Sequence, residues 1–488
     1  MSINVWEQDL LNREWDAEYL YRLSLGRNQE NVRTQKSSFV LNIDAPWGQG
    51  KSFFLNAVYK TVLERGHPAV FINAWQYDFV DDPFSICVAA LDEYFKILET
   101  QKTITKTEKF QKGLKIVRSQ FLNITLTLGK AVLKKAINKV AENGFDTITE
   151  SLATGRSHGA TEKGFAEDVA DTIEEQIGTF TEAAIDKFAQ TQIDNINETK
   201  RSLGLFQGGL RLIIEAMGES QSHQLPMFIF VDELDRCRPT YAISMLERIK
   251  HIFDIPNVVF IISTDTESLS HSVKAVYGNE FRSREYLGRF FNRTYKLPAA
   301  SNEKIILQML QERGTDISKW SVPTRDDGIK NIVVFLDQTS SQYEMNIRPV
   351  KYAIEILMDI TSAWDALYKI ELTYLFTLIC QFVKTGEIDD VAFRDKLQAI
   401  KGWNFELNYK LTSYKEIISG VGSFSNNTLM DAIDGVQKQI NNGASPIYSY
   451  FHKILIEELD AGDRALAMKG PTSYSKYKGM ILHSRHLT

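Results

Sequence analysis

The segment FVLNIDAPWGQGKSFFLNAV, residues 39–58, joins an apolar run, a glycine-containing turn and a second apolar stretch. The first run has the composition of a parallel β-strand that is covered on both faces. The second, which starts at Phe53, continues with helical spacing. This order of a buried strand, a tight turn and a helix predicts an α/β domain.

The turn keeps the last part of the phosphate-binding pattern G-x-x-x-x-G-K-[ST], in which backbone N–H groups and a lysine hold a triphosphate and a hydroxyl holds Mg²⁺. Ala45 stands where the first glycine is expected. Alanine fits there if the turn takes a negative φ and is strained if φ is positive. The alternative is a strand, turn and helix that bind nothing and carry a solvated lysine. The predicted nucleotide contacts are Trp47, Gly48, Gln49, Gly50, Lys51, Ser52 and Phe53.

A second motif lies far downstream, in PMFIFVDELDRCRP, residues 226–239. Its apolar strand ends in two carboxylates, and nucleotide hydrolysis needs one carboxylate beside Mg²⁺ and one that polarises the attacking water. We predict that Asp232 and Ser52 lie on the Mg²⁺ side and that Glu233 is the catalytic base. The alternative is that both acids cap the helix that follows.

Two further strands are predicted, AVFINAW at residues 69–75 and NVVFIISTD at residues 257–265. Strands that alternate with helices indicate a parallel sheet with its ligand at the C-terminal edge. The second of these strands ends at Asp265, which either contributes to sensing the γ-phosphate or positioning water, or caps the next helix. Both interpretations stay open. No N-K-x-D motif follows, so a preference for GTP finds no support.

The whole chain has the composition of a soluble globular protein, with 488 residues, 43% hydrophobic residues and a formal net charge of −6. This charge argues against nonspecific binding of nucleic acid over the whole surface. Its three cysteines are far apart and form no C-x-x-C pair, so a reducing compartment fits best. The N-terminal residues do not follow the order of a secretion signal, and no apolar stretch is long enough to span a bilayer. We expect a cytoplasmic protein.

Residues 100–205 form an insertion that is too long for an ordinary connection. Its first part places Lys102, Lys106 and Lys109 on one helical face, and apolar residues at 110, 114, 117 and 121 on another. Such a helix either binds anionic membrane or nucleic acid, or packs on its own protein. Farther along, Val169, Ile173, Ile177 and Phe188 have the spacing of a helical hairpin or bundle, and residues 151–163 have the composition of a flexible tip.

Three of these stretches together resemble the KAP group of P-loop NTPases, within the STAND and AAA+-like proteins. They are the segments Trp47–Ser52, Asn73–Trp75 and Asp232–Cys237. The resemblance covers about residues 37–360. It implies a P-loop NTPase sheet sandwiched by helices, with ATP and Mg²⁺ as cofactors and a helical insertion between the two nucleotide motifs. Relatives often carry transmembrane helices in this insertion, which this sequence lacks.

The resemblance also implies basic residues that complete the site. EYLGRFFNRTYKLP, residues 285–298, resembles the segment where related ATPases carry an arginine that neutralises charge on the transferring phosphoryl group. Arg289, Arg293 and Arg236 are the candidates, and a surface or interface salt bridge is the alternative for each. NIRPVKYAIEIL, residues 346–357, resembles the start of a lid helix, which makes Arg348 a candidate γ-phosphate sensor.

These patterns divide the chain into five regions. They are an N-terminal helical segment (1–36), a P-loop NTPase core (37–99 and 206–300), a helical insertion (100–205), a helical lid (301–360) and a mainly helical C-terminal domain (361–488).

The sequence supports three hypotheses of function. The first is a Mg²⁺-dependent ATPase that assembles or switches a complex as a homo-oligomer with a separate effector protein; resemblance to bacterial relatives, including phage exclusion proteins, suggests antiphage defence. The second is a nucleotide-gated scaffold with little turnover. The third is a DNA-stimulated motor that binds nucleic acid through the basic insertion helix.

Overall fold

The computed structural model describes residues 5–34, 38–80, 82–100, 107–121, 124, 182–220, 223–299, 301–323, 328–388, 404–407, 410–413, 420–422, 424, 426–443, 447–461 and 464–484. The chain divides into two compact units. The sheet unit comprises Asp16–Ala45 and Ser52–Leu297, and the helical unit comprises Met1–Trp15, Pro46–Lys51 and Pro298–Thr488.

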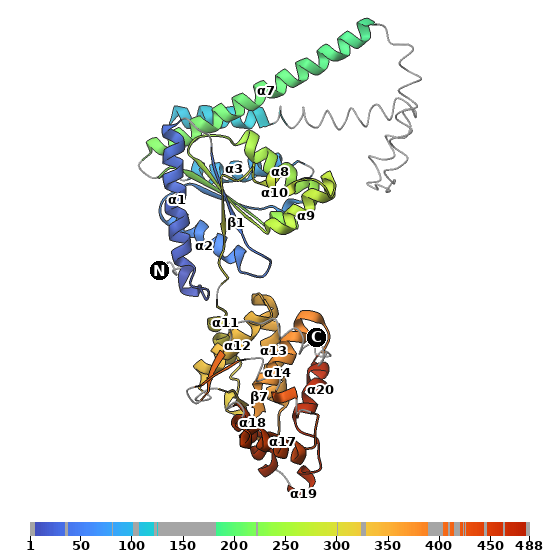
Figure 1. Cartoon of the computed structure of the whole chain (residues 1–488). Helices are drawn as coiled ribbons and strands as arrows, with labels where there is room; N and C mark the ends of the chain where they lie inside the picture. Colours follow the sequence, from blue (N-terminus) through green and yellow to red (C-terminus); the bar gives the residue numbers. More distant parts are fainter. Residues whose placement is uncertain are drawn as a thin grey trace, which may run out of the picture. The chain divides into compact units, whose positions relative to one another are not determined.

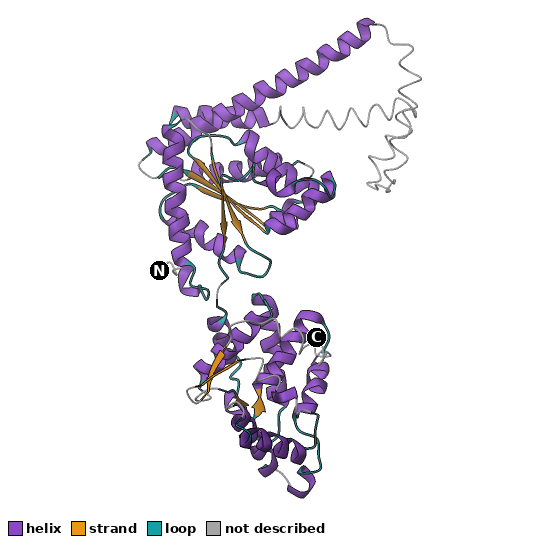
Figure 2. Cartoon of the chain, in the orientation of Figure 1, coloured by secondary structure: helices purple, strands orange, loops and turns teal. Residues whose placement is uncertain are grey.

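The sheet unit is built on five parallel strands, drawn in orange in Figure 2. The strands are β1 (Phe39–Asp44), β2 (Ala69–Asn73), β3 (Met227–Asp232), β4 (Val258–Thr264) and β5 (Arg293–Lys296). Their order across the sheet is β2-β3-β4-β1-β5. The strand before the glycine-containing turn, β1, and the acidic strand, β3, are therefore both neighbours of β4. The prediction of an α/β fold with a parallel sheet is confirmed.

Helices cover both faces of this sheet, as Figure 1 shows. The helices are α1 (Glu14–Arg33), α2 (Lys51–Glu64), α3 (Pro83–Thr100), α7 (Glu182–Glu219), α8 (Pro239–Ile252), α9 (Thr266–Tyr277) and α10 (Ser283–Leu287), with short 3₁₀ turns η2 (Trp75–Tyr77) and η3 (Leu234–Arg236). On one face, rings from α1 and α2 lie against strand phenylalanines, as Tyr21 does against Phe228. On the other face, buried side chains of α3, α7, α8 and α9 form one cluster with the strands.

The predicted amphipathic segment of the insertion is a helix over residues 108–121, and it packs on the protein itself. Phe110, Leu114 and Val117 are buried. Lys109 pairs with Glu219 at 2.5 Å and with Glu215 at 3.5 Å. This confirms the packing interpretation for this segment. Several predictions concern residues that lie outside the described part of the chain: Lys102, Lys106, residues 151–163, Val169, Ile173, Ile177 and the side chain of Phe188.

The helical unit carries most of the remaining elements. They are η1 (Val5–Gln8), α11 (Glu303–Glu312), η4 (Ile317–Lys319), β6 (Trp320–Ser321), α12 (Ile329–Gln342), α13 (Ile347–Ala363), β7 (Ile370–Glu371), α14 (Leu372–Thr385), β8 (Asn404–Leu407), β9 (Lys410–Ser413), α17 (Leu429–Asn441), α18 (Ile447–Asp460), α19 (Arg464–Ala467) and α20 (Tyr474–Ser484).

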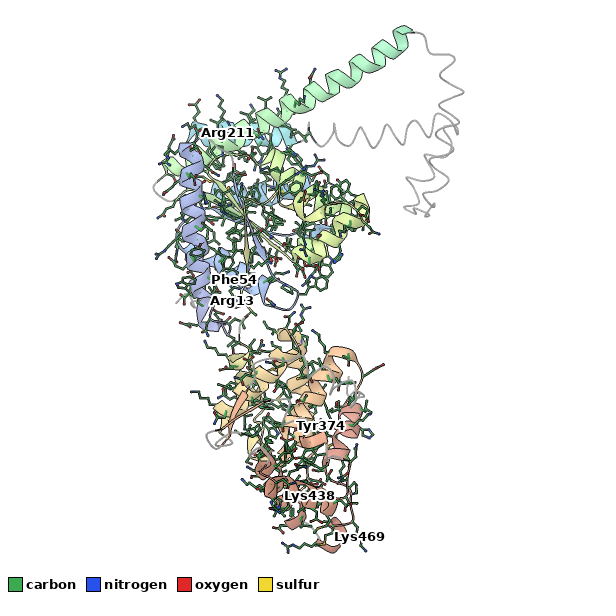
Figure 3. All side chains as sticks on the ribbon, viewed as in Figure 1. Arg13, Phe54, Arg211, Tyr374, Lys438 and Lys469 are labelled. Carbon is green, nitrogen blue, oxygen red and sulfur yellow. The ribbon has the colours of Figure 1, made fainter. Side chains whose placement is uncertain are left out.

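One hydrophobic cluster spans the helical unit and includes residues from α11 to α20. Tyr374, labelled in Figure 3, belongs to it. The cluster runs through residues 306–481, so the contacts do not separate the predicted lid from the predicted C-terminal domain. No helix in the described part of the chain combines the length and apolar character needed to cross a membrane.

Candidate functional site

The glycine-containing turn joins β1 to α2 and has the backbone shape that its glycines permit. Gly48 and Gly50 have φ values of +79° and +77°, which disfavour any residue with a side chain. Ala45 is not among the described residues with positive φ, and its N–H donates to the carbonyl of Thr264 at 3.1 Å. Alanine is therefore unstrained at the position where the pattern expects glycine. Lys51 begins α2, whose first N–H groups have no partner within the helix.

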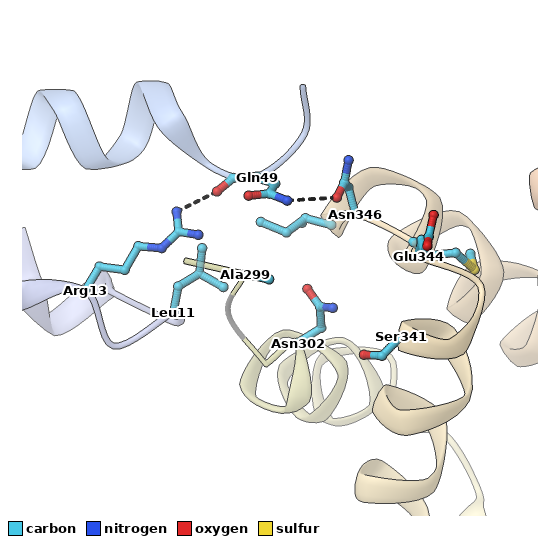
Figure 4. Close-up of a pocket in the computed structure, with 10 residues that line it drawn as sticks. Leu11, Arg13, Gln49, Ala299, Asn302, Ser341, Glu344 and Asn346 are labelled. Carbon is cyan, nitrogen blue, oxygen red and sulfur yellow. Dashed lines mark hydrogen bonds between the residues drawn. The ribbon is translucent and has the colours of Figure 1, made fainter. Parts of the chain in front are cut away.

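Carbonyl groups of the turn accept hydrogen bonds within the helical unit. Asn346 Nδ2 donates to the carbonyl of Trp47 at 2.9 Å, and Ile347 N donates to that of Gly48 at 3.2 Å. Arg13 Nη1 donates to the carbonyl of Gln49 at 2.6 Å (Figure 4). These three bonds fix the positions of the carbonyl groups of the turn. Arg13 is not among the residues that the sequence predicts for the site, because a single arginine in an N-terminal segment has no recognisable pattern.

A cavity of about 280 Å³ lies beside the turn in the helical unit. Figure 4 shows Gln49 on one side of it, with Asn302 and Ser341 on another. It is lined by Leu11, Arg13, Gln49, Ala299, Asn302, Ser341, Glu344, Met345, Asn346 and Ile347. Its walls thus combine apolar side chains with amides, a hydroxyl and charged groups, which is the usual character of a small-molecule site.

The end of β3 places Asp232 in the interior of the sheet unit, with its side chain only 4% exposed. The hydroxyls of Ser52 and Ser263 both lie near this carboxyl. Glu233 N donates to Asp232 Oδ1 at 2.9 Å. Burial raises the pKa of Asp232, and the Glu233 N–H and the two nearby hydroxyls offset only part of that rise.

This environment fits a divalent cation. The groups that contact the Asp232 carboxyl are uncharged donors, and the nearby charge of Glu233 also raises its pKa. A cation would compensate the buried charge. Mg²⁺ binds through one or two protein oxygens while it keeps waters and phosphate ligands, so the pair of Ser52 and Asp232 suits it.

Glu233 follows Asp232 in a left-handed conformation, with φ 60° and ψ 27°. Asn73 Nδ2 donates to Glu233 Oε2 at 3.0 Å. Arg236 Nη1 pairs with Glu233 Oε1 at 2.8 Å. Glu233 precedes η3 but makes no side-chain cap bond to it, so the capping alternative is wrong for Glu233. Its carboxylate instead lies between an amide and a guanidinium.

Asp265 caps α9, because its side chain accepts a hydrogen bond from Ser268 N at 3.1 Å. This confirms the capping interpretation; a role with the γ-phosphate stays a prediction. Nearby, the Thr264 hydroxyl donates to Asn42 Oδ1 at 2.9 Å, so the polar end of β4 is tied to β1.

The predicted basic residues fall into three settings. Arg236 pairs with Glu233 within the chain. Arg289 and Arg293 are exposed near β5, where Arg293 Nη1 donates to the carbonyl of Asn292 at 3.2 Å. Arg348 is exposed and lies against the turn, since a Cβ added to Gly48 would be 3.6 Å from its Cγ.

Two groupings of the predicted residues therefore exist inside single units: Ser52 with Asp232 and Glu233 in the sheet unit, and Arg348 with Gly48 in the helical unit. Trp47 and Phe53 have exposed side chains.

Comparison with known families decides the class of the chain. Residues 30–363, which carry all three motifs, match the KAP family P-loop domain. The chain belongs to the KAP family of P-loop NTPases. The family resemblance drawn from Trp47–Ser52, Asn73–Trp75 and Asp232–Cys237 is thus confirmed, and the match includes the insertion between the motifs.

Comparison with curated proteins gives no match. Among solved structures, this KAP protein is similar to the Aeropyrum pernix ORC2 protein in its ADPNP-ADP complexes, with 10% identity, a TM-score of 0.30 and coverage of 99% of this chain and 98% of that one. The ADP form of the same protein gives 10% identity, a TM-score of 0.28 and coverage of 97% and 85%. At these TM-scores the assignment rests on the family match alone.

Proposed function

We propose that this KAP protein is a Mg²⁺-dependent ATPase that uses ATP binding and hydrolysis to assemble or switch a complex. The observation that carries the proposal is that the Ser52 hydroxyl lies beside the buried carboxyl of Asp232. These residues come from motifs far apart in the sequence, and the phosphate-binding pattern requires their meeting.

The residues of the chain divide the work as follows. The turn and the start of α2 offer backbone N–H groups and Lys51 to the phosphates. Ser52 and Asp232 would hold Mg²⁺, which when bound neutralises charge on the phosphate oxygens. Glu233 would take the proton of the attacking water. Arg348, which lies against Gly48, is the proposed γ-phosphate sensor.

The cavity beside the turn is our proposed place for the nucleoside. Its volume of about 280 Å³ and its mixture of apolar and amide side chains suit a purine and a ribose. Leu11 and Ile347 line this cavity and would contact the base. Both side chains also lie close to Gly50 of the turn.

The test is steady-state hydrolysis of ATP with Mg²⁺ by the wild type and by Lys51→Ala, Glu233→Gln and Lys60→Ala. Lys60 is exposed on the same helix as Lys51 and serves as the matched control. We expect turnover in the wild type and Lys60→Ala, none in Lys51→Ala, and bound but unhydrolysed ATP in Glu233→Gln. Equal turnover by wild type and Lys51→Ala would contradict the site.

The gated scaffold is the second candidate. It is favoured by the two contacts that occupy the Glu233 carboxylate. Nucleotide binding that depends on Lys51, without turnover at any protein concentration, would support it. The DNA motor gains nothing from the described part of the insertion, where Lys109 is engaged by Glu215 and Glu219.

The biological setting is also proposed: a cytoplasmic homo-oligomer in antiphage defence with a separate effector, in which Arg289 or Arg293 completes the site of a neighbour. Turnover that rises with protein concentration and falls in Arg289→Ala or Arg293→Ala would support the oligomer. Deletion of the gene with unchanged phage plating would argue against a defence role.

A further inference from the structure

Arg236 connects the proposed catalytic base to the surface of the sheet unit. On one side its guanidinium pairs with Glu233 Oε1 at 2.8 Å. On the other its Cζ lies 5.4 Å from the ring centroid of Trp75, within the range of a cation–π interaction. Its side chain is 27% exposed, against 15% for Glu233, so the pair is shielded from water better than an ordinary surface ion pair.

The carboxylate of Glu233 is occupied at both oxygens, by Arg236 at Oε1 and by Asn73 at Oε2. A general base must accept a proton from a water within hydrogen-bond reach. The guanidinium and the amide fix the orientation of this carboxylate, and turning it toward a water on another side would break the charge-assisted bond to Arg236. This pairing therefore holds the base away from its proposed reaction.

Trp75 lies at the start of an exposed aromatic loop, which we define as residues 75–79. The exposed fractions are 52% for Trp75, 41% for Tyr77 and 80% for Phe79. The backbone of the loop is fixed at Asp78. Arg238 N donates to Asp78 Oδ2 at 3.0 Å, and the Arg238 guanidinium pairs with the same carboxylate. The contact between Trp75 and Arg236 is thus held by a defined loop and is open to solvent.

We infer that Arg236 is a positioning residue that withholds Glu233 from hydrolysis, and that the ring of Trp75 keeps Arg236 in that position. The inference rests on the proposed function, because it needs Glu233 to be the base. It assigns Arg236 a role opposite to that of an arginine that stabilises the transferring phosphoryl group. Removing Arg236 then speeds turnover, whereas removing a phosphoryl-stabilising arginine slows it.

The experiment compares kcat and KM for ATP in the full chain for the wild type, Arg236→Gln, Arg236→Lys and Arg282→Gln. Arg282 is the control, because it makes an i,i+3 ion pair with Glu285 on the surface of the same unit, away from Glu233. We expect Arg236→Gln to raise kcat about tenfold with KM unchanged, as loss of one charge-assisted hydrogen bond allows. Arg236→Lys should restore part of the wild-type rate, and Arg282→Gln should match the wild type.

A second set of variants changes Trp75 and leaves both charged residues, Glu233 and Arg236, in place. Trp75→Ala should raise kcat in the same direction by a smaller factor, whereas Trp75→Phe keeps a ring and should stay near the wild type. Phe79→Ala controls for a general effect of trimming the aromatic loop and should leave kcat unchanged.

Unchanged or lower kcat in both Arg236→Gln and Trp75→Ala, with an active wild type, would overturn the inference and leave the ATPase proposal standing. A rate gained in Arg236→Gln must disappear in the double variant with Lys51→Ala; if it persists, it does not arise at this site. If neither wild type nor Arg236→Gln turns over ATP that both bind, hydrolysis itself fails and the inference fails with it.

Discussion

At the scale of single residues, the Asp232 carboxyl is the most informative group. It is buried, its neighbours are uncharged donors, and its pKa is raised because of burial. When the pKa of a group is higher in the folded state than in the unfolded state, its protonated form stabilises the fold. This stabilisation is fully present below the unfolded-state pKa and is lost as pH rises through the folded-state pKa. At neutral pH the nucleotide-free protein therefore carries the cost of a buried charge.

Asp232→Asn should remove that cost. We expect the free energy of unfolding without nucleotide to rise by about 1 kcal/mol at neutral pH, while stabilisation by ATP with Mg²⁺ is lost. Denaturant titration with and without Mg²⁺ and ATP measures both. Asp434→Asn, at an exposed position of α17, should change neither. A less stable Asp232→Asn protein would show that the carboxylate is compensated in the folded state.

The sequence predicted that Ser52 and Asp232 both lie on the Mg²⁺ side of the site, because each motif has a fixed internal spacing and fixed chemistry. The two side chains do lie near each other, and their role with Mg²⁺ stays a prediction. The sequence did not foretell Arg13, Asn73 or Asn346 as contacts. Their hydrogen bonds to Gln49, Glu233 and Trp47, respectively, are set by the tertiary fold. From the sequence, a salt bridge was only a general alternative for Arg236. Its i,i+3 spacing from Glu233 does not reveal that the same carboxylate also binds Asn73.

At the scale of elements, the helix over residues 108–121 and α7 meet at two glycines. A Cβ added at Gly113 would lie 2.7 Å from the carbonyl oxygen of Gly209 and 2.8 Å from Ile213 Cγ1. The backbones approach so closely that Gly113 has no room for a methyl group, and at Gly209 the nearest atoms would lie only 3.0 Å from an added Cβ. This contact holds the described start of the insertion against α7.

Gly113→Ala should therefore destabilise the protein by about 2 kcal/mol through overpacking. Gly208→Ala is the matched control: it is on α7, next to the contact, and nothing lies within 4 Å of its added Cβ. It should stabilise by about 0.5 to 1 kcal/mol, because alanine favours a helix over glycine. Equal effects of the two substitutions on chemical unfolding would contradict the close approach of the helices.

Glu371 caps α14 from a fully buried position. Its side chain accepts hydrogen bonds from Thr373 N at 2.9 Å and Tyr374 N at 3.0 Å. Burial nevertheless raises its pKa from 4.5 to about 7. The stabilisation by its protonated form is present below pH 4.5 and is lost as pH rises toward 7.

Glu371→Gln should keep one cap acceptor and remove this dependence. The wild type should lose on the order of 3 kcal/mol of unfolding free energy across that window relative to the variant. Unfolding of both proteins followed from pH 5 to about pH 8 measures the difference. Glu355→Gln, exposed on α13, should follow the wild type. Parallel curves for Glu371→Gln and wild type would show that the group is ionised throughout.

The sequence predicted β1, β2, β3 and β4 because each is an apolar run. It did not predict β5, whose residues RTYK are mostly exposed. This strand has no hydrophobic pattern of its own and exists because β1 offers it a free edge to pair with. The same holds for β6 and β7, two residues each, which pair only with one another.

At the scale of the whole molecule, the two units have separate hydrophobic clusters. Leu375 is fully buried in the cluster of the helical unit, and Leu246 is equally buried in that of the sheet unit. The hydrophobic cluster continues across the predicted boundary between the lid and the C-terminal domain. Sequence periodicity identifies single helices, and it does not reveal which helices share one core.

Two separate cores predict two unfolding transitions by calorimetry. Leu375→Ala and Leu246→Ala should each cost about 3 kcal/mol and shift different transitions. A single transition that both substitutions lower equally would show that the chain unfolds as one cooperative unit.

The turn at Pro46–Lys51 belongs to the same compact unit as Pro298–Thr488, which the ribosome synthesises much later. Trp47 and its hydrogen-bond partner Asn346 are 299 positions apart in the chain. At the roughly 5 to 20 residues per second of translation, the ribosome needs about 15 to 60 seconds to pass from one to the other. During that interval the emerging turn lacks the groups that fix its carbonyls. A nascent chain thus completes its sheet before it completes the proposed nucleotide pocket, so we expect ATP to stabilise the finished protein but not the early stages of its synthesis.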